Sequence, residues 1–262
     1  MATAAPPTPT TAADLGIDRE FLIKMGQIPV IALVWAAAAG FATSLFAQLG
    51  WLKTVTAGDE TFLFNLGPVV VICLGMLLAA FIDGYAFKVP NWVTLSLVLS
   101  GWYLGLANDL GFHFAATAPN GGGGLWAAFF CTCLGFALLF PALFIGGMGQ
   151  GDVKMTMGFG SWLGFYFGRW NGSWNLFWSF AIGVLVGGVF AIVMMIARRQ
   201  GGLNLANTRA IVTDLQVMAA TGVTAGKQRA AARRPDWWRL PYGVPLCVGF
   251  LGYLWYAFFV LN

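Results

Sequence analysis

Long apolar runs recur along the whole chain, and they restrict the fold more than any other feature of the sequence. Of the 262 residues, 59% are hydrophobic and only 9% are charged, whereas a soluble domain is about 25% charged. In a bilayer, each run must satisfy its backbone hydrogen bonds internally, and a helix of about 20 residues does so while it crosses the hydrocarbon core. These runs exclude a water-soluble protein and predict an all-α, polytopic membrane bundle.

Seven apolar segments predict about seven transmembrane helices. They are Ile28–Leu52, Phe62–Ile82, Val89–Ala107, Gly124–Ile145, Val153–Phe167, Leu176–Ala197 and Leu240–Leu261. The fifth is short and could form a re-entrant hairpin, but the basic residues favour a full crossing. With seven crossings, twelve of the fourteen Lys and Arg residues fall on one side, and only Lys53 and Arg169 fall on the other. The positive-inside rule then predicts an inner-membrane protein with a cytoplasmic amino terminus and an extracytoplasmic carboxyl terminus.

The two hydrophilic parts of the chain are both predicted to be cytoplasmic. Residues 1–27 are rich in Ala, Pro and Thr and lack the basic-then-apolar order of a signal peptide, so we expect a partly disordered tail. Residues 28–262 would form the membrane domain, with a basic loop at 198–239 that fits an amphipathic surface helix and a solvated connector equally well. The net charge of +4 follows from these cytoplasmic cations, so the expected surroundings are a lipid bilayer and no nucleic acid.

Two of the ten acidic residues lie at the ends of apolar segments. Asp83 ends the second segment, and Asp152 begins the fifth. The distribution of Lys and Arg places both at the same cytoplasmic boundary, where they could meet. Ionisable groups at membrane depth usually face a partner or a wet cavity, which makes both aspartates candidates for function. An aspartate at a helix start can also simply cap that helix.

A close pair of carboxyl groups can perform general acid–base chemistry. Two adjacent carboxyls share a proton and titrate as a unit, so one can activate a water while the other protonates a scissile carbonyl, as in aspartic proteases. The single histidine, His113, has no partner for a catalytic triad or a metal site, so we expect neither metal nor cofactor. The alternatives are a proton- or ion-coupled transporter that uses the aspartates as a relay and a catalytically silent scaffold.

Three motifs in the correct order resemble the type IV prepilin peptidases, which are membrane aspartic proteases. The tetrad that ends in Asp152 is similar to their GxGD motif, within Gly-Met-Gly-Gln-Gly-Asp-Val-Lys. Asp83, with Pro90 and Asn91 seven and eight positions later, resembles their Asp-to-Pro-Asn stretch. Leu240–Pro245 looks like their Pro-Tyr-Gly segment before a late span. In the presenilin branch, a Tyr-Asp pair precedes the tetrad and a Pro-Ala-Leu follows it, and this chain lacks that order.

The resemblance implies a catalytic pair and a substrate class. Asp83 and Asp152 would be catalytic, and a pilin-like precursor with a short basic leader before a hydrophobic helix would be cut near their junction. The chain has no CxxC pair, which implies a short enzyme without the methyltransferase domain, as in those for tight-adherence pili or preflagellins. The residues expected to contact the substrate are Gly149, Gly151, Pro90, Asn91 and Lys154.

Overall fold

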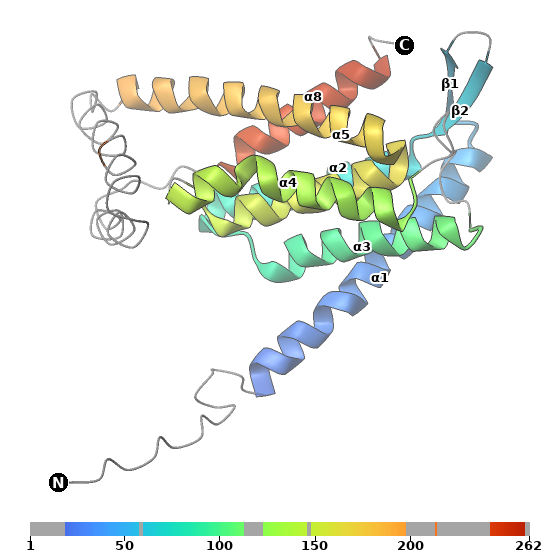
Figure 1. Ribbon diagram of the computed structural model, residues 1–262, viewed down its shortest axis with the longest axis horizontal. Helices are drawn as coiled ribbons and strands as arrows, with labels where there is room; N and C mark the ends of the chain where they lie inside the picture. Colours follow the sequence, from blue (N-terminus) through green and yellow to red (C-terminus); the bar gives the residue numbers. More distant parts are fainter. Residues whose placement is uncertain are drawn as a thin grey trace, which may run out of the picture.

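The computed structural model describes residues 19–57, 60–112, 123–145, 148–197, 213 and 242–259. Its elements, in chain order, are α1 (Arg19–Gln48), β1 (Leu52–Ala57), β2 (Glu60–Asn65), α2 (Gly67–Ala86), α3 (Asn91–Asp109), α4 (Leu125–Ile145), α5 (Gln150–Ala197) and α8 (Gly243–Phe259). Helices α2, α3, α4 and α5 lie roughly along one axis, whereas α1 crosses them obliquely and its first half projects away from the others (Figure 1). The all-α class is therefore confirmed.

The first two predicted segments differ from the structure at the hairpin that separates them. Strands β1 and β2 pair antiparallel, with Leu52 opposite Asn65. The sequence analysis assigned Phe62 to a span, but Thr, Phe and Val are common in strands, and α2 begins only at Gly67. The Asn65 side chain fixes this start, because its amide donates to Thr43 O (2.7 Å) and its oxygen accepts from Gly67 N (2.9 Å).

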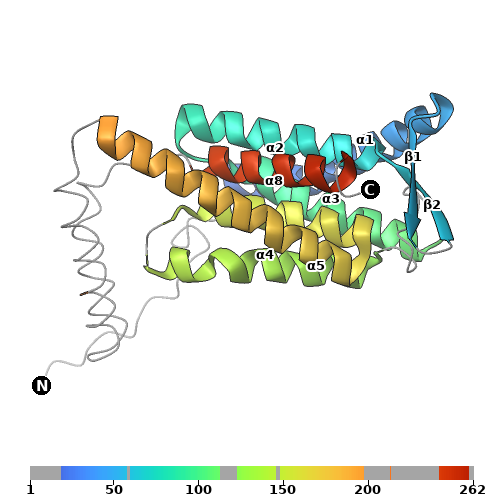
Figure 2. The ribbon, with the colours of Figure 1, turned by 90° about the horizontal axis from the view of Figure 1, so that it is seen from above.

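Helix α5 contains a reversal where the sequence analysis placed a loop between two spans. Gly168 has φ 79° and ψ 178°, a backbone conformation that is essentially restricted to glycine. The arms before and after it run side by side (Figures 1 and 2). They approach so closely that a Cβ added to Gly172 would lie 2.7 Å from Leu163 O. The fifth and sixth predicted segments are thus two arms joined by a one-residue turn.

Four helices of the described residues are long and apolar enough to cross a membrane, which identifies a membrane protein. The predicted total of seven spans stays a prediction, because α5 contributes both of its arms to one of the four, α8 is shorter, and α3 is not among them. Helix α1 also begins inside the segment predicted as a tail, whereas residues 1–18 and the 198–239 loop, apart from Thr213, lie outside the described residues. The four helical ranges are Leu22–Gln48, Gly67–Ala86, Leu125–Phe144 and Gln150–Met194.

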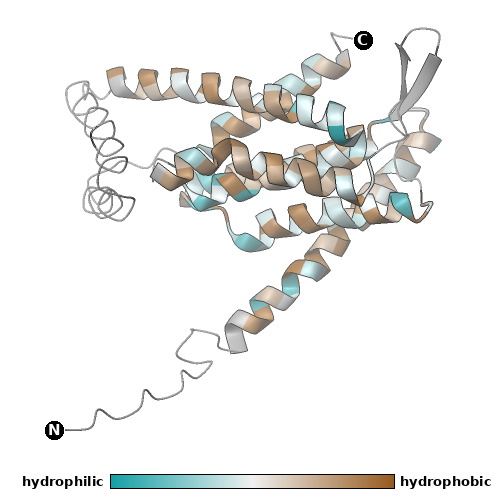
Figure 3. Cartoon of the chain, in the orientation of Figure 1, coloured by the Kyte–Doolittle hydropathy of each residue, from teal (hydrophilic) through white to brown (hydrophobic). Residues whose placement is uncertain are grey.

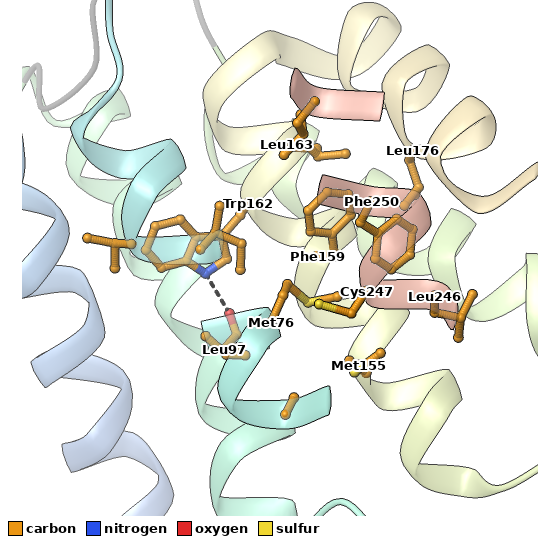
Figure 4. Packing of buried hydrophobic residues seen from close by; sticks show 14 of the residues in the cluster. Met76, Leu97, Met155, Phe159, Trp162, Leu163, Leu176, Leu246, Cys247 and Phe250 are labelled. Atoms are coloured by element: carbon orange, nitrogen blue, oxygen red, sulfur yellow. Dashed lines mark hydrogen bonds between the residues drawn. The ribbon is translucent and has the colours of Figure 1, made fainter. Parts of the chain in front are cut away.

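The core of the bundle is formed where α5 meets its neighbours. Trp162 is 1% exposed and its Nε1 donates to Leu97 O and to Ser100 Oγ of α3, both at 3.0 Å. Phe159 stacks on Phe250 of α8 with 4.1 Å between ring centroids, and Figure 4 shows this cluster. Apolar residues colour much of every helix (Figure 3), and many large ones are exposed, among them Leu74, Phe81 and Leu185, as expected for contact with lipid. The packing therefore holds α3 and α8 against the arm that begins with Asp152.

Candidate active site

Asp83 lies in the last turn of α2 and is buried, with only 6% of its surface exposed. The helix ends three residues later, at Ala86, because Phe87 adopts the left-handed conformation with φ 52°. The N–H of Phe87 still donates to Asp83 O (2.8 Å). Phe87 is not a glycine, so this conformation is uncommon. The chain thus leaves the helix one turn after Asp83, and the Asp83 carboxyl lies at the end of the helix.

The first residue of α8 holds the Asp83 side chain. Gly243 N donates to Asp83 Oδ2 at 2.9 Å. The first N–H groups of a helix have no partner within it and carry partial positive charge, so a carboxylate satisfies them well. Sequence analysis named the Leu240–Pro245 motif without giving Gly243 a role. The motif was the available signal, but the contact joins residues 160 positions apart.

Asp152 lies in the first turn of α5 and is also 6% exposed. The N–H of Gly149 donates a hydrogen bond to its carboxyl, which is the arrangement of an acidic residue at the third position of a helix. Gly151 lies against Val89, because an added Cβ would be 3.3 Å from the Val89 backbone nitrogen. The glycines around Asp152 therefore permit both the cap and the close approach of the segment before α3.

The two carboxyl groups lie close enough to repel each other electrostatically. They come from the end of α2 and the beginning of α5, which lie at the same end of the bundle (Figure 1). Two buried carboxyls that interact electrostatically do not both ionise readily, so they titrate as a unit. Such a pair can both accept a proton from a water molecule and donate one to a bound carbonyl group.

Of the other sequence-predicted residues, Gly149 bonds to the pair, because its N–H donates to the Asp152 carboxyl. Pro90 is the residue before α3, and Asn91 begins that helix. Lys154 Nζ donates to Asn91 Oδ1 at 2.8 Å on the exposed side of the site. This bond joins the first turns of α3 and α5. Gly149 is exposed, and Gly151 is half-buried.

Tyr242 is a further residue near the pair that the sequence analysis did not select. It is half-buried and directly precedes α8. Burial raises the pKa of its phenol above the ordinary value, and the negative charge of Asp152 raises that pKa further. The phenol therefore keeps its proton at neutral pH. The sequence signal was again the motif before the last span, which gave no indication of the distance to Asp152.

The opposite end of the bundle carries a cavity of about 740 Å³ between α3, α4 and the Gly168 turn. Its lining includes Asp109 and Arg169 and none of the residues named above for the aspartate site. Within the described ranges, no three His, Cys, Asp or Glu residues are grouped so that they could hold a metal ion. His113 lies outside those ranges.

Comparison with known proteins gives one match. The model of the type IV leader peptidase family matches residues 69–197. This segment begins in α2 and ends with α5, so it includes Asp83 and Asp152 but not α8. No curated protein and no solved structure matches the chain.

Proposed function

Because residues 69–197 identify the chain as a member of the type IV leader peptidase family, we propose that it is an aspartic endopeptidase whose catalytic residues are Asp83 and Asp152. Family membership by itself implies a peptidase. The observation that carries the aspartic assignment is the placement of two buried carboxyls, from helices distant in sequence, within electrostatic reach of each other.

The pair would begin the reaction with one proton between its two carboxyl groups. The ionised carboxyl takes a proton from water while the water oxygen attacks the scissile carbonyl carbon, and the protonated carboxyl gives its proton to the carbonyl oxygen. A tetrahedral diol results. Its collapse breaks the C–N bond as the protonated carboxyl gives its proton to the amide nitrogen and the ionised carboxyl takes one from a diol hydroxyl. The products are a carboxylic acid and an amine, and the pair again holds one proton.

The proposed substrate is a pilin-like precursor with a basic leader followed by a hydrophobic helix. In such a precursor, the bond between the two parts lies at a membrane boundary, and both aspartates lie at one end of the bundle. The excess of Lys and Arg on that side of the sequence favours the cytoplasmic face of the inner membrane. Lys154 has the same charge as the leader, so we propose that it joins α3 and α5 through Asn91 and does not bind the leader.

The proposal is tested with purified protein in vesicles and a pilin-like precursor, with release of the leader followed by mass spectrometry. Asp83→Asn and Asp152→Asn should each lower the cleavage rate about 100- to 10,000-fold, the range for loss of a general acid or base. Asp109→Asn is the matched control, because Asp109 lies at the opposite end of the bundle and an amide oxygen can still accept from Leu125 N, as its carboxylate does (2.8 Å).

Undiminished cleavage by either variant would remove the proposed pair. Proton or ion flux that both substitutions abolish, without any cleavage by the parent protein, would instead establish the transporter. The position of the aspartates at one end of the bundle supports the peptidase, since a relay needs titratable groups along a path across the membrane.

A further inference from the structure

The first turn of α8 contacts Asp83 from outside the segment that matches the family. Besides the hydrogen bond from Gly243 N to Asp83 Oδ2 (2.9 Å), the two residues pack directly on each other. A Cβ added to Gly243 would lie 2.7 Å from Oδ2 and 3.0 Å from both Cβ and Cγ of Asp83. The absence of a side chain at position 243 therefore allows the carboxyl of Asp83 to occupy its place.

The body of α8 is fixed on α5, the helix that carries Asp152. Phe250 stacks on Phe159 with 4.1 Å between centroids, and both side chains are fully buried (Figure 4). Next to Phe250, the backbone of Gly249 lies very close to the backbone of Gly183 in the second arm of α5. A methyl group on Gly249 would overlap the backbone atoms of Gly183. Close approach through glycine is typical of tightly packed membrane helices. Helix α8 therefore cannot shift easily relative to α5.

Helix α2 packs more extensively on α8 than on α5. Leu246, Cys247 and Phe250 of α8 belong to the same buried cluster as Met76 of α2 and Phe159 of α5. Figure 4 shows Met76 beside Cys247, close to the stacked rings of Phe159 and Phe250. The relative position of the two aspartates therefore depends largely on α8, which contacts both helices that carry them.

We propose that α8 sets the separation of Asp83 and Asp152, and that Gly243 is the positioning residue through which it acts. This inference rests on the proposed function, because it concerns the geometry of that catalytic pair. A methyl group at position 243 would force the Asp83 carboxyl to move, since α8 is held in place by its contacts with α5. A displacement of about 1 Å at a reacting group can cost about 100-fold in rate.

The test compares Gly243→Ala with Gly252→Ala in the vesicle assay, with the full-length protein in both cases. Gly252 lies in the same helix, is exposed and has nothing within 4 Å of an added Cβ, so its variant should cleave like the parent. Gly243→Ala should lower kcat about 100-fold and leave KM within about twofold, because substrate binding does not depend on the exact position of the Asp83 carboxyl.

A second measurement separates misplacement from poor folding. A smaller folded fraction lowers the rate equally at every pH, whereas a displaced Asp83 changes how the pair holds its proton and so changes the shape of the kcat–pH profile. We expect a changed shape. The inference is overturned if Gly243→Ala has the same kcat as Gly252→Ala. It is also overturned if Gly243→Ala lowers kcat by the same factor at every pH. If Asp83→Asn or Asp152→Asn also retains cleavage, the proposed function itself fails.

Discussion

The two ends of the helical bundle use the same kind of side chain in different ways. At one end, Asp83 and Asp152 are buried, and their carboxyls repel each other. At the other end, Asp109 is exposed and accepts from Leu125 N at the start of α4 (2.8 Å), while the guanidinium of Arg169 lies 4.9 Å from the centroid of the Trp170 ring. Capping fully explains Asp109. Capping does not explain why two carboxyls are buried close together, because each opposes the ionisation of the other.

The comparison predicts that substitutions at the end of the bundle opposite the aspartate pair lower the stability of the protein. The cleavage rate per folded molecule should not change. The largest effect is expected for Gly168→Ala, because φ 79° with ψ 178° is a conformation that alanine adopts only with strain of about 1–3 kcal/mol. Thermal unfolding in detergent should show this loss. Gly188→Ala, in the same helix with nothing within 4 Å of an added Cβ, is the control. Equal unfolding temperatures for the two variants would contradict the one-residue reversal.

A smaller loss of stability is expected when the cap of α4 is removed. Asp109→Ala deletes the acceptor of Leu125 N and should lower the free energy of unfolding by about 1 kcal/mol, the typical effect of a lost cap. Asp109→Asn keeps an acceptor and should be close to the parent. A loss of cleavage activity per folded molecule in Asp109→Asn would break the distinction between the two ends.

At the aspartate end, loss of the hydrogen bond between Lys154 and Asn91 should lower stability by a smaller amount. Lys154→Met removes the hydrogen bond at 2.8 Å, which is exposed and so contributes about 0.5–1 kcal/mol. Because the ammonium is not proposed to bind the basic leader, KM for the precursor should not rise. A severalfold increase in KM with unchanged stability would instead assign Lys154 to substrate binding.

The smallest change in stability is expected for Tyr242→Phe, and only at alkaline pH. The pKa of its phenol is raised by burial and by Asp152, whereas the unfolded chain has the ordinary value of about 10. The folded state therefore holds this proton more tightly, and the associated stability is complete below pH 10 and is lost as the pH rises above it. Tyr242→Phe should remove that alkaline loss in a comparison of unfolding temperatures at about pH 8 and pH 11.

Tyr85→Phe serves as the control for that comparison, because Tyr85 lies at the same end and is 85% exposed. It should retain the alkaline loss of the parent protein. Identical alkaline behaviour of Tyr242→Phe and Tyr85→Phe would contradict the raised pKa of the Tyr242 phenol.

Hydropathy predicted the parts of the fold that depend on local sequence. The predicted segment Gly124–Ile145 agrees with α4 within one residue at its start and matches its end, since a helix in lipid needs only a sufficiently long apolar run. The β1–β2 hairpin was missed because Phe62, Leu63 and Phe64 are apolar and lie close enough to α2 to merge with it in a hydropathy profile. The sequence placed a connection between Phe167 and Leu176 but did not reduce it to a single residue, because many glycines in this chain are helical and the positive φ of Gly168 depends on tertiary packing.

The residues of the candidate site could be proposed from their type and position in the sequence. Their contacts could not. Asp83 and Asp152 could be selected because carboxyls at the ends of apolar segments are uncommon, and charge counting placed them on one side. The support from Gly243 could not be predicted, because it depends on how α8 packs between α2 and α5 rather than on any local pattern. Lys154 was expected to contact the substrate, and only the three-dimensional arrangement reveals its bond to Asn91.

The claim that Asp83 and Asp152 act as one catalytic unit is tested most directly by the double variant Asp83→Asn/Asp152→Asn. Single-turnover cleavage of a pilin-like precursor would be measured for this variant and for both single variants in the same vesicles. Groups that act as a unit are strongly non-additive, so the double variant should be no slower than the slower single variant. Losses that multiply, or a single variant that cleaves at the parent rate, would contradict the shared role of the two carboxyls.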